Sequence, residues 1–166
     1  MWQKLKRILK HRWLDDSDTR RAVPPELLHH LTRRVAASEQ RHTGEVRICV
    51  EAGLPLSYLW RGAKARERAV MMFGKLRVWD TEHNNGVLIY LLFAERRVEI
   101  VADRGLNHRV TQTQWDAICR RMEASFSDGR YESGLAEGIS AIGELLREHF
   151  PAEVGANEQA DRPTIV

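Results

Sequence analysis

Side chains of the kinds that bind hard cations gather in one predicted loop and in one turn further along the chain. The loop carries carboxylates, an imidazole and amides at Asp80, Glu82, His83, Asn84 and Asn85. The turn adds a carboxylate at Asp103 and an imidazole at His108. Because Ca²⁺ and Mg²⁺ bind clustered oxygens, this pattern predicts a weak divalent-cation site with ligands from Asp80, Glu82, Asn84, Asn85 and Asp103.

A predicted hairpin would bring the loop and the turn together. The unbroken apolar run 87–94 is typical of a strand buried on both faces, and Val98, Ile100 and Ala102 continue at the two-residue period of a second strand. A tight turn at Glu95-Arg96 would place Asp103 opposite Leu88 and Gly105 opposite Gly86. Asp103 would then lie beside the loop at residues 80–85.

The same residues have a simpler interpretation. Asn and Gly tolerate positive φ, so Asn84-Asn85-Gly86 is also a turn sequence whose neighbouring acids are solvated. The spacing of the acids is not that of an EF-hand. The sequence leaves both interpretations open.

Hydrolysis is a further chemical hypothesis for these residues. Asp103 with His83 or His108 as acid or base could support metal-assisted hydrolysis. The chain has no Cys-x5-Arg loop, Asp-x-Asp nucleophile or Gly-rich phosphate loop. Cys49 and Cys119 lie in apolar patterns, which predicts buried free thiols and a reducing, cytoplasmic compartment.

The remaining periodic segments predict the elements that hold these residues. Val46, Ile48 and Val50 alternate with more polar residues and indicate a half-buried strand. Helices are predicted from Pro24 to about Arg41, from about Gly62 to Leu76 with its Arg and Lys on a wet face, from Thr111 to Phe126, and from Tyr131 to Leu146. Gly134 and Gly138 lie one turn apart, so an adjacent element could approach closely there. Trp60 and Trp79 are expected in the core. The order of elements predicts an α/β/α sandwich around a small mixed sheet.

The first residues form a basic amphipathic arm. From Trp2 to Leu14 the apolar residues recur at helical spacing, at Trp2, Leu5, Ile8, Leu9 and Trp13. The same stretch holds five cations and no acid; subtracting these five from the 26 Lys and Arg leaves 21 against 23 acids, so the body carries a charge of −2. The body, a protein partner or an anionic membrane surface could cover the apolar stripe. Nucleic-acid binding would have to work through the arm alone.

The predicted domain organisation is an arm at residues 1–20, an α/β domain at 21–151 and a disordered tail at 152–166. Thr164-Ile165-Val166 has the form of a peptide that adds a strand to a sheet, although a frayed end is the simpler expectation. No stretch approaches the length of a membrane-spanning helix.

Two runs of sequence resemble one known family. The first runs from Asn84-Asn85-Gly86 through Asp103-Arg104-Gly105-Leu106, and the second comprises Gly129-Arg130-Tyr131 and Gly134. Over roughly residues 44–150 the chain is similar to the TPM domain, a family that includes a photosystem II repair factor of the thylakoid lumen and many bacterial envelope proteins.

The resemblance implies an α/β/α sandwich, a divalent-cation site in some members and a weak acid phosphatase activity in at least one. Asn84, Asn85, Gly86 and the turn at 103–105 match the family pattern. The chain differs from the secreted family norm, which has a signal peptide. We therefore expect a cytoplasmic, bacterial-type accessory or binding domain of unassigned role, with no organic cofactor and an unknown protein partner. A metal-dependent phosphatase is the alternative, and a nucleic-acid binder has lower weight.

Overall fold

The computed structural model describes residues 2–13, 16–152 and 164–165. In chain order these form α1 (Trp2–Trp13), α2 (Asp16–Ala22), α3 (Pro25–Glu39), β1 (Val46–Glu51), α4 (Leu56–Trp60), α5 (Ala65–Lys75), β2 (Val87–Leu92), η1 (Phe93–Glu95), β3 (Arg97–Ala102), η2 (Arg104–Leu106), α6 (Gln112–Ser127), α7 (Tyr131–His149) and β4 (Thr164–Ile165). The elements η1 and η2 are single 3₁₀ turns.

The strands form one mixed sheet in the order β3-β2-β1-β4. Strands β2 and β3 are the predicted antiparallel hairpin, while β1 runs parallel to β2. All six residues of β2 are buried, as the unbroken apolar run predicts. The sheet therefore needs cover on both faces.

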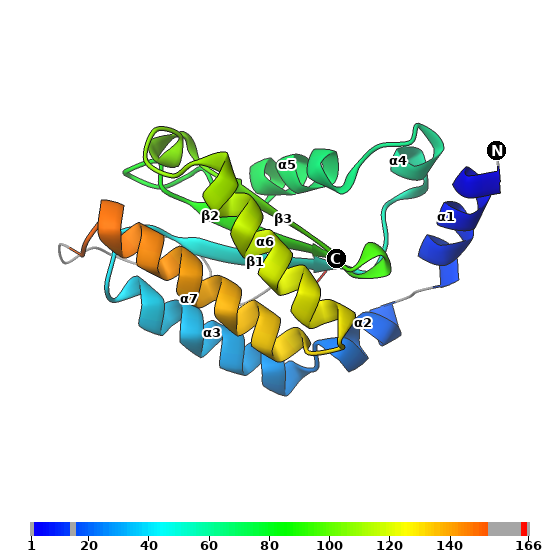
Figure 1. The fold of residues 1–166 in the computed structure, drawn as a ribbon, viewed down its shortest axis with the longest axis horizontal. Helices are drawn as coiled ribbons and strands as arrows, with labels where there is room; N and C mark the ends of the chain where they lie inside the picture. Colours follow the sequence, from blue (N-terminus) through cyan, green and yellow to red (C-terminus); the bar gives the residue numbers. More distant parts are fainter. Residues whose placement is uncertain (1, 14–15, 153–163, 166) are drawn as a thin grey trace.

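Helices cover both faces, which confirms the α/β/α sandwich (Figure 1). Alternate residues of β2 project to opposite sides: Val87, Ile89 and Leu91 join a core with α3, α6 and α7, and Leu88, Tyr90 and Leu92 join a second core with α5. A capping box formed by Thr111 and Gln114 begins α6.

Helices α6 and α7 approach closely at two glycines, as their spacing predicts. A Cβ at Gly134 would lie 2.5 Å from Phe126 Cε1, and one at Gly138 would lie 2.5 Å from Met122 Sδ. Both positions therefore need the absence of a side chain.

The predicted hairpin register was wrong by two residues. Residues 93–96 form a four-residue connection through η1, in place of a tight turn at Glu95-Arg96. Ala102 consequently pairs with Val87, and Asp103 lies opposite Gly86 instead of Leu88. The even shift keeps every side chain on its predicted face of the sheet.

Other local expectations also fail. Helix α2, within the segment assigned to the arm, and helix α4 were not predicted. Trp60, the last residue of α4, and Trp79, in the turn after α5, are exposed and do not join the core. Thr164 and Ile165 pair with Cys49 and Val50 of β1 as a short parallel strand, so the frayed end does not hold for these two residues. Residues 153–163 of the predicted tail lie outside the described part.

One ion pair is buried between the sheet and α5, where the sequence predicted a wet face. Arg68 donates to both carboxylate oxygens of Glu51, with Nη2 to Oε1 at 2.5 Å and Nε to Oε2 at 2.9 Å. The hydroxyl of Tyr90 donates to Glu51 Oε2 at 2.5 Å, and burial raises the pKa of Tyr90. Tyr58 stacks on the Arg68 guanidinium. The strand predicted to be half-buried is thus covered on both faces. The carboxylate of Glu51 can be buried there since the Arg68 guanidinium balances its charge.

Helix α1 lies on the body through a polar face. The Arg7 guanidinium donates to Glu95 Oε1 at 2.7 Å and to the carbonyl of Ala63 at 2.9 Å. The amide of Leu54 donates to His11 Nδ1 at 3.0 Å, so the ring proton is on Nε2, which donates to Glu95 Oε1 at 2.9 Å. We call Arg7, His11 and Glu95 the latch. Its hydrogen bond from His11, with the Arg7 charge, lowers the pKa of Glu95 to about 2.

Removing one partner of the buried pair should destabilise the domain strongly. We expect Arg68→Ala to lower the free energy of unfolding by about 3–5 kcal/mol, because Glu51 is left buried and uncompensated. Arg61→Ala is the matched control: Arg61 also lies over Tyr58 and pairs with Glu67, but at the surface, so its loss should cost less than about 1 kcal/mol. Urea denaturation measures both. Equal losses would show that the buried pair has no special weight.

Acid should release α1. Because the folded-state pKa of Glu95 is lowered, its contribution to docking is present above the ordinary pKa of about 4.5 and is lost as the pH falls toward about 2. We expect the NMR signal of the Leu54 amide to shift in that window while Ile89 in β2 still reports a folded sheet. Glu95→Gln should show the released signal at neutral pH. A Leu54 signal insensitive to Glu95→Gln would contradict the latch.

Candidate functional site

Backbone hydrogen bonds bring the predicted loop and turn together at one end of the sheet. The amide of Asp103 donates to the carbonyl of Gly86 at 2.9 Å, and the amide of Gly105 donates to the carbonyl of Asn84 at 2.8 Å. Arg104 Nε donates to Asn84 Oδ1 at 3.0 Å. The prediction that Asp103 lies beside the loop is confirmed. We call residues 80–86 and 103–108 the rim.

The shape of the rim depends on positions that few other residue types could occupy. Asn84 has φ 51°, a left-handed conformation that Asn tolerates. A Cβ at Gly86 would lie 1.9 Å from the carbonyl oxygen of Val78, and one at Gly105 would lie 2.5 Å from that of Asn84. The Asn85 side chain is buried and donates from Nδ2 to Thr43 Oγ1 at 3.1 Å. Turn geometry therefore accounts for Asn84 and both glycines.

Turn geometry does not account for two oxygen atoms at the rim. Asn85 Oδ1 and Asp103 Oδ2 are buried and have no hydrogen-bond partner in the described structure. The other Asp103 oxygen, Oδ1, accepts from the Arg104 amide at 2.7 Å and begins η2. Leaving a polar atom buried without a partner is costly, so such atoms mark a place for water or an ion. An amide and a carboxylate oxygen are donors that Ca²⁺ and Mg²⁺ accept.

The other predicted ligands and catalytic groups lie further out. Asp80 is exposed and accepts from Arg77 Nη2 at 2.6 Å. Glu82, His83 and His108 are exposed as well. Within the described part of the chain, no three His, Cys, Asp or Glu side chains converge as metal ligands. Of the five predicted ligands, Asn85 and Asp103 therefore remain candidates for direct contact with an ion. The side-chain oxygen of Asn84 already accepts a hydrogen bond from Arg104.

A serine–histidine pair escaped the sequence analysis. Ser38 Oγ lies 3.0 Å from His42 Nε2, and His42 Nδ1 lies 2.8 Å from the carbonyl oxygen of Gly44. Both side chains are buried, and a Cβ at Gly143 would lie 2.2 Å from Ser38 Oγ. Burial lowers the pKa of His42. The four-residue spacing on a helix was the available signal, but helix α7 seals the pair from any substrate.

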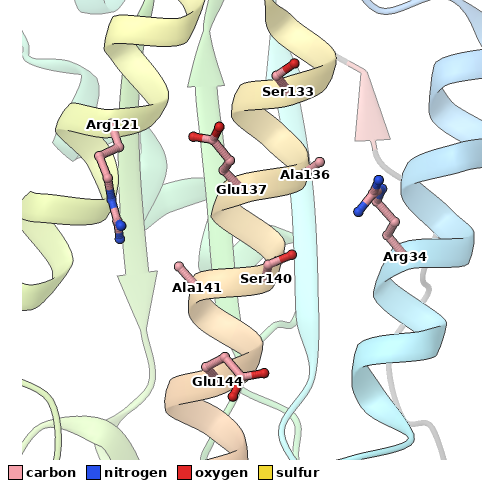
Figure 2. Close-up of a pocket in the computed structure, with 8 residues that line it drawn as sticks. All are labelled: Arg34, Arg121, Ser133, Ala136, Glu137, Ser140, Ala141 and Glu144. Atoms are coloured by element: carbon pink, nitrogen blue, oxygen red, sulfur yellow. The ribbon is translucent and has the colours of Figure 1, made fainter.

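A shallow groove of about 530 Å³ crosses the outer surface of the helical layer (Figure 2). Small residues of α7 form its floor, and Arg34 of α3 and Arg121 of α6 stand on either side. The charged residues that line it are exposed. A ligand there would stay hydrated, so the groove is a weaker candidate than the rim.

Comparisons with known proteins agree with this fold. The family model of the TPM domain matches residues 17–145. The solution structure of protein BA42 from the psychrophilic bacterium Bizionia argentinensis is similar, with 25% identity, a TM-score of 0.75, and coverage of 85% of this chain and 93% of that one. The N-terminal domain of a P. gingivalis protein shares the fold at 22% identity and a TM-score of 0.56, over 78% of this chain and 81% of that one. No curated protein matches the sequence.

The cysteines should be poor nucleophiles. Burial raises the pKa of both Cys49 and Cys119 to about 12. At pH 8 about one thiol in 10,000 would be ionised, and the thiolate is the reactive form. We expect iodoacetamide to label neither residue appreciably in the folded protein and both after unfolding in urea, as measured by mass spectrometry. Rapid labelling of folded Cys119 would show an accessible, activated thiol.

Proposed function

The chain belongs to the TPM domain family, and from this premise we propose that it is a binding domain whose rim holds one divalent cation weakly through oxygen atoms. The observation that supports the proposal is the pair of buried oxygens, Asn85 Oδ1 and Asp103 Oδ2, that have no hydrogen-bond partner. A hard cation beside Asp103 Oδ2 would give that buried oxygen a partner at the point where η2 begins, and the Asn85 oxygen is a second candidate ligand on the neighbouring loop.

The affinity should be low. Affinity for Ca²⁺ rises with the number of charged ligands, and among the described rim residues Asp103 is the one carboxylate with a buried oxygen that lacks a hydrogen-bond partner. Asp80 is turned to Arg77, and the nearby Arg104 guanidinium opposes another cation. Water would supply the remaining ligands. We expect dissociation constants of about millimolar, as in the weakest oxygen-ligand sites of proteins.

Binding is a better-supported role than hydrolysis. Metal-assisted hydrolysis needs a group that activates water beside the metal. The two histidines that could serve, His83 and His108, are exposed, and in the described part of the chain neither is hydrogen-bonded to the Asp103 carboxylate. The burial of Ser38 and of Cys49 supports the same choice.

We further propose an accessory role in the cytoplasm with an unidentified protein partner. Two free cysteines support a reducing compartment. No helix in the described residues has the length and apolar character needed to cross a membrane.

Titration with Ca²⁺ and with Mg²⁺, followed by amide NMR, tests the cation site. We expect shifts first around Glu82 to Gly86 and at Asp103, at millimolar ion. Asp103→Asn keeps an oxygen to cap η2 but removes the charge, so it should abolish the shifts without unfolding the domain. Asp80→Asn is the matched control, because its carboxylate is exposed and paired with Arg77.

Two results would overturn the proposal. If no rim residue responds, or if Asp80→Asn weakens the response as much as Asp103→Asn, Asp103 and Asn85 do not form a cation site. Turnover of a generic phosphoester with Mg²⁺ or Mn²⁺ is expected to be absent. Turnover that Asp103→Asn eliminates would make the protein an enzyme rather than a binding domain.

A further inference from the structure

The arm helix α1 turns its apolar stripe away from the body. Trp2, Leu5, Leu9 and Trp13 are 77%, 52%, 50% and 85% exposed. At 100° per residue the four side chains fall within an arc of about 80°, and the centre of that arc lies about 160° from His11. The latch residues, with Ile8 beside them, face the body. Within the described residues, the contacts between α1 and the body therefore leave the stripe uncovered.

Exposing four large apolar side chains on one helix is unusual for a soluble surface. Scattered single residues need no explanation, but a continuous patch of this kind marks an interaction site. Helix α4 is packed against α1 at the same end of the molecule and exposes Leu56 and Trp60 as well (Figure 1). This end of the protein is thus unusually apolar.

Cations flank the stripe on both sides. Lys6 and Lys10 lie along one border and Arg12 along the other, and all three are exposed. The sequence of α1 contains no acid. A second copy of α1 docked on the stripe would bring like charges together, which disfavours self-association. A surface that is apolar inside and anionic at its boundary complements the stripe and both borders at once.

We propose that α1, held on the body by the latch, docks the protein onto an anionic lipid bilayer surface. The apolar stripe enters the boundary between headgroups and acyl chains, Trp2 and Trp13 lie at its two ends, and the lysines reach the lipid phosphates. Attachment is reversible, because each nearby cation adds about 1 kcal/mol and salt weakens that attraction. The proposal does not depend on the cation site at the rim.

Co-sedimentation of the full chain with vesicles of phosphatidylglycerol and phosphatidylcholine tests this inference. Binding should be strong at low salt, fall as salt rises, and be much weaker on phosphatidylcholine alone. Lys6→Gln with Lys10→Gln should lower the partition coefficient about 30-fold, which is two cations at about 1 kcal/mol each. The matched control is Arg120→Gln with Arg121→Gln, an exposed basic pair on α6 that should leave binding unchanged.

The apolar side is tested separately with Leu5→Ser and Leu9→Ser together. Binding should be lost while the Leu54 amide keeps its docked NMR signal, which shows that α1 is still held by the latch. Trp79→Ser removes an exposed tryptophan after α5 and should have no effect. Deleting the residues up to Leu14 should abolish binding completely.

Three results would overturn the proposal. The truncated chain could sediment with vesicles as well as the full chain does. The protein could form a dimer in solution that Leu5→Ser with Leu9→Ser dissociates, which would make a second copy the occupant. A DNA oligonucleotide could bind with the same dependence on Lys6 and Lys10 and none on Leu5 and Leu9, which would make the arm a nucleic-acid contact.

Discussion

Strand β2 imposes the main constraint on this molecule. All six of its side chains are buried, so each face of the sheet must carry a layer of helices. Apart from buried polar contacts such as those of Glu51 with Arg68 and of Ser38 with His42, polar groups that a ligand could reach then lie at the two ends of the strand or on the outer surfaces of the helices. The loop of the rim ends at Gly86, immediately before β2, and the latch residue Glu95 lies just beyond the other end of the strand. Six residues at about 3.3 Å each separate these two sites by about 20 Å.

The same burial explains why the rim holds oxygens without partners. Gly86 and Gly105 let backbone segments approach so closely that a Cβ would collide with a neighbouring carbonyl. At the same end of the sheet Asn85 Oδ1 and Asp103 Oδ2 are buried, while the backbone donors nearby already bond to other carbonyls. Inside the sheet the problem is solved differently, because Arg68 and Tyr90 satisfy Glu51 directly. Glu51 is thus satisfied by protein groups and is structural, whereas the rim oxygens without partners are the reason for proposing an ion there.

Periodic patterns predicted most of the fold, because long apolar runs have few alternative structures. The sandwich, the hairpin and helices α3, α5, α6 and α7 follow from such runs. The register was not predictable, since a four-residue 3₁₀ connection and a tight turn leave the same alternation on each strand. Strand β4 was missed because two residues carry no period, and α4 because five carry little more than one turn.

The candidate site was predictable only as a neighbourhood. Asn84, Asn85 and Asp103 were brought together because a hairpin must return to its origin, whatever its register. Which carboxylate points inward depends on side-chain partners, and Asp80 is drawn outward by Arg77. Arg68 was wrongly predicted to face solvent, because its partner Glu51 lies 17 positions away on another element and sequence spacing does not reveal the pair.

Helix α1 shows that an amphipathic pattern does not say which face meets the body. Apolar burial contributes about 25 cal/mol per Å², so the stripe would be expected to turn inward. The latch outweighs that tendency because Arg7 and His11 together make four hydrogen bonds, two of them to a single carboxylate oxygen of Glu95. Because α1 is held in this way, its apolar stripe remains exposed and could be buried against an external surface. The latch would then fix the orientation of the body relative to that surface. Since the latch and the rim lie at opposite ends of β2, a bilayer bound by α1 would leave the rim facing away from the lipid, open to a cation and to a protein partner.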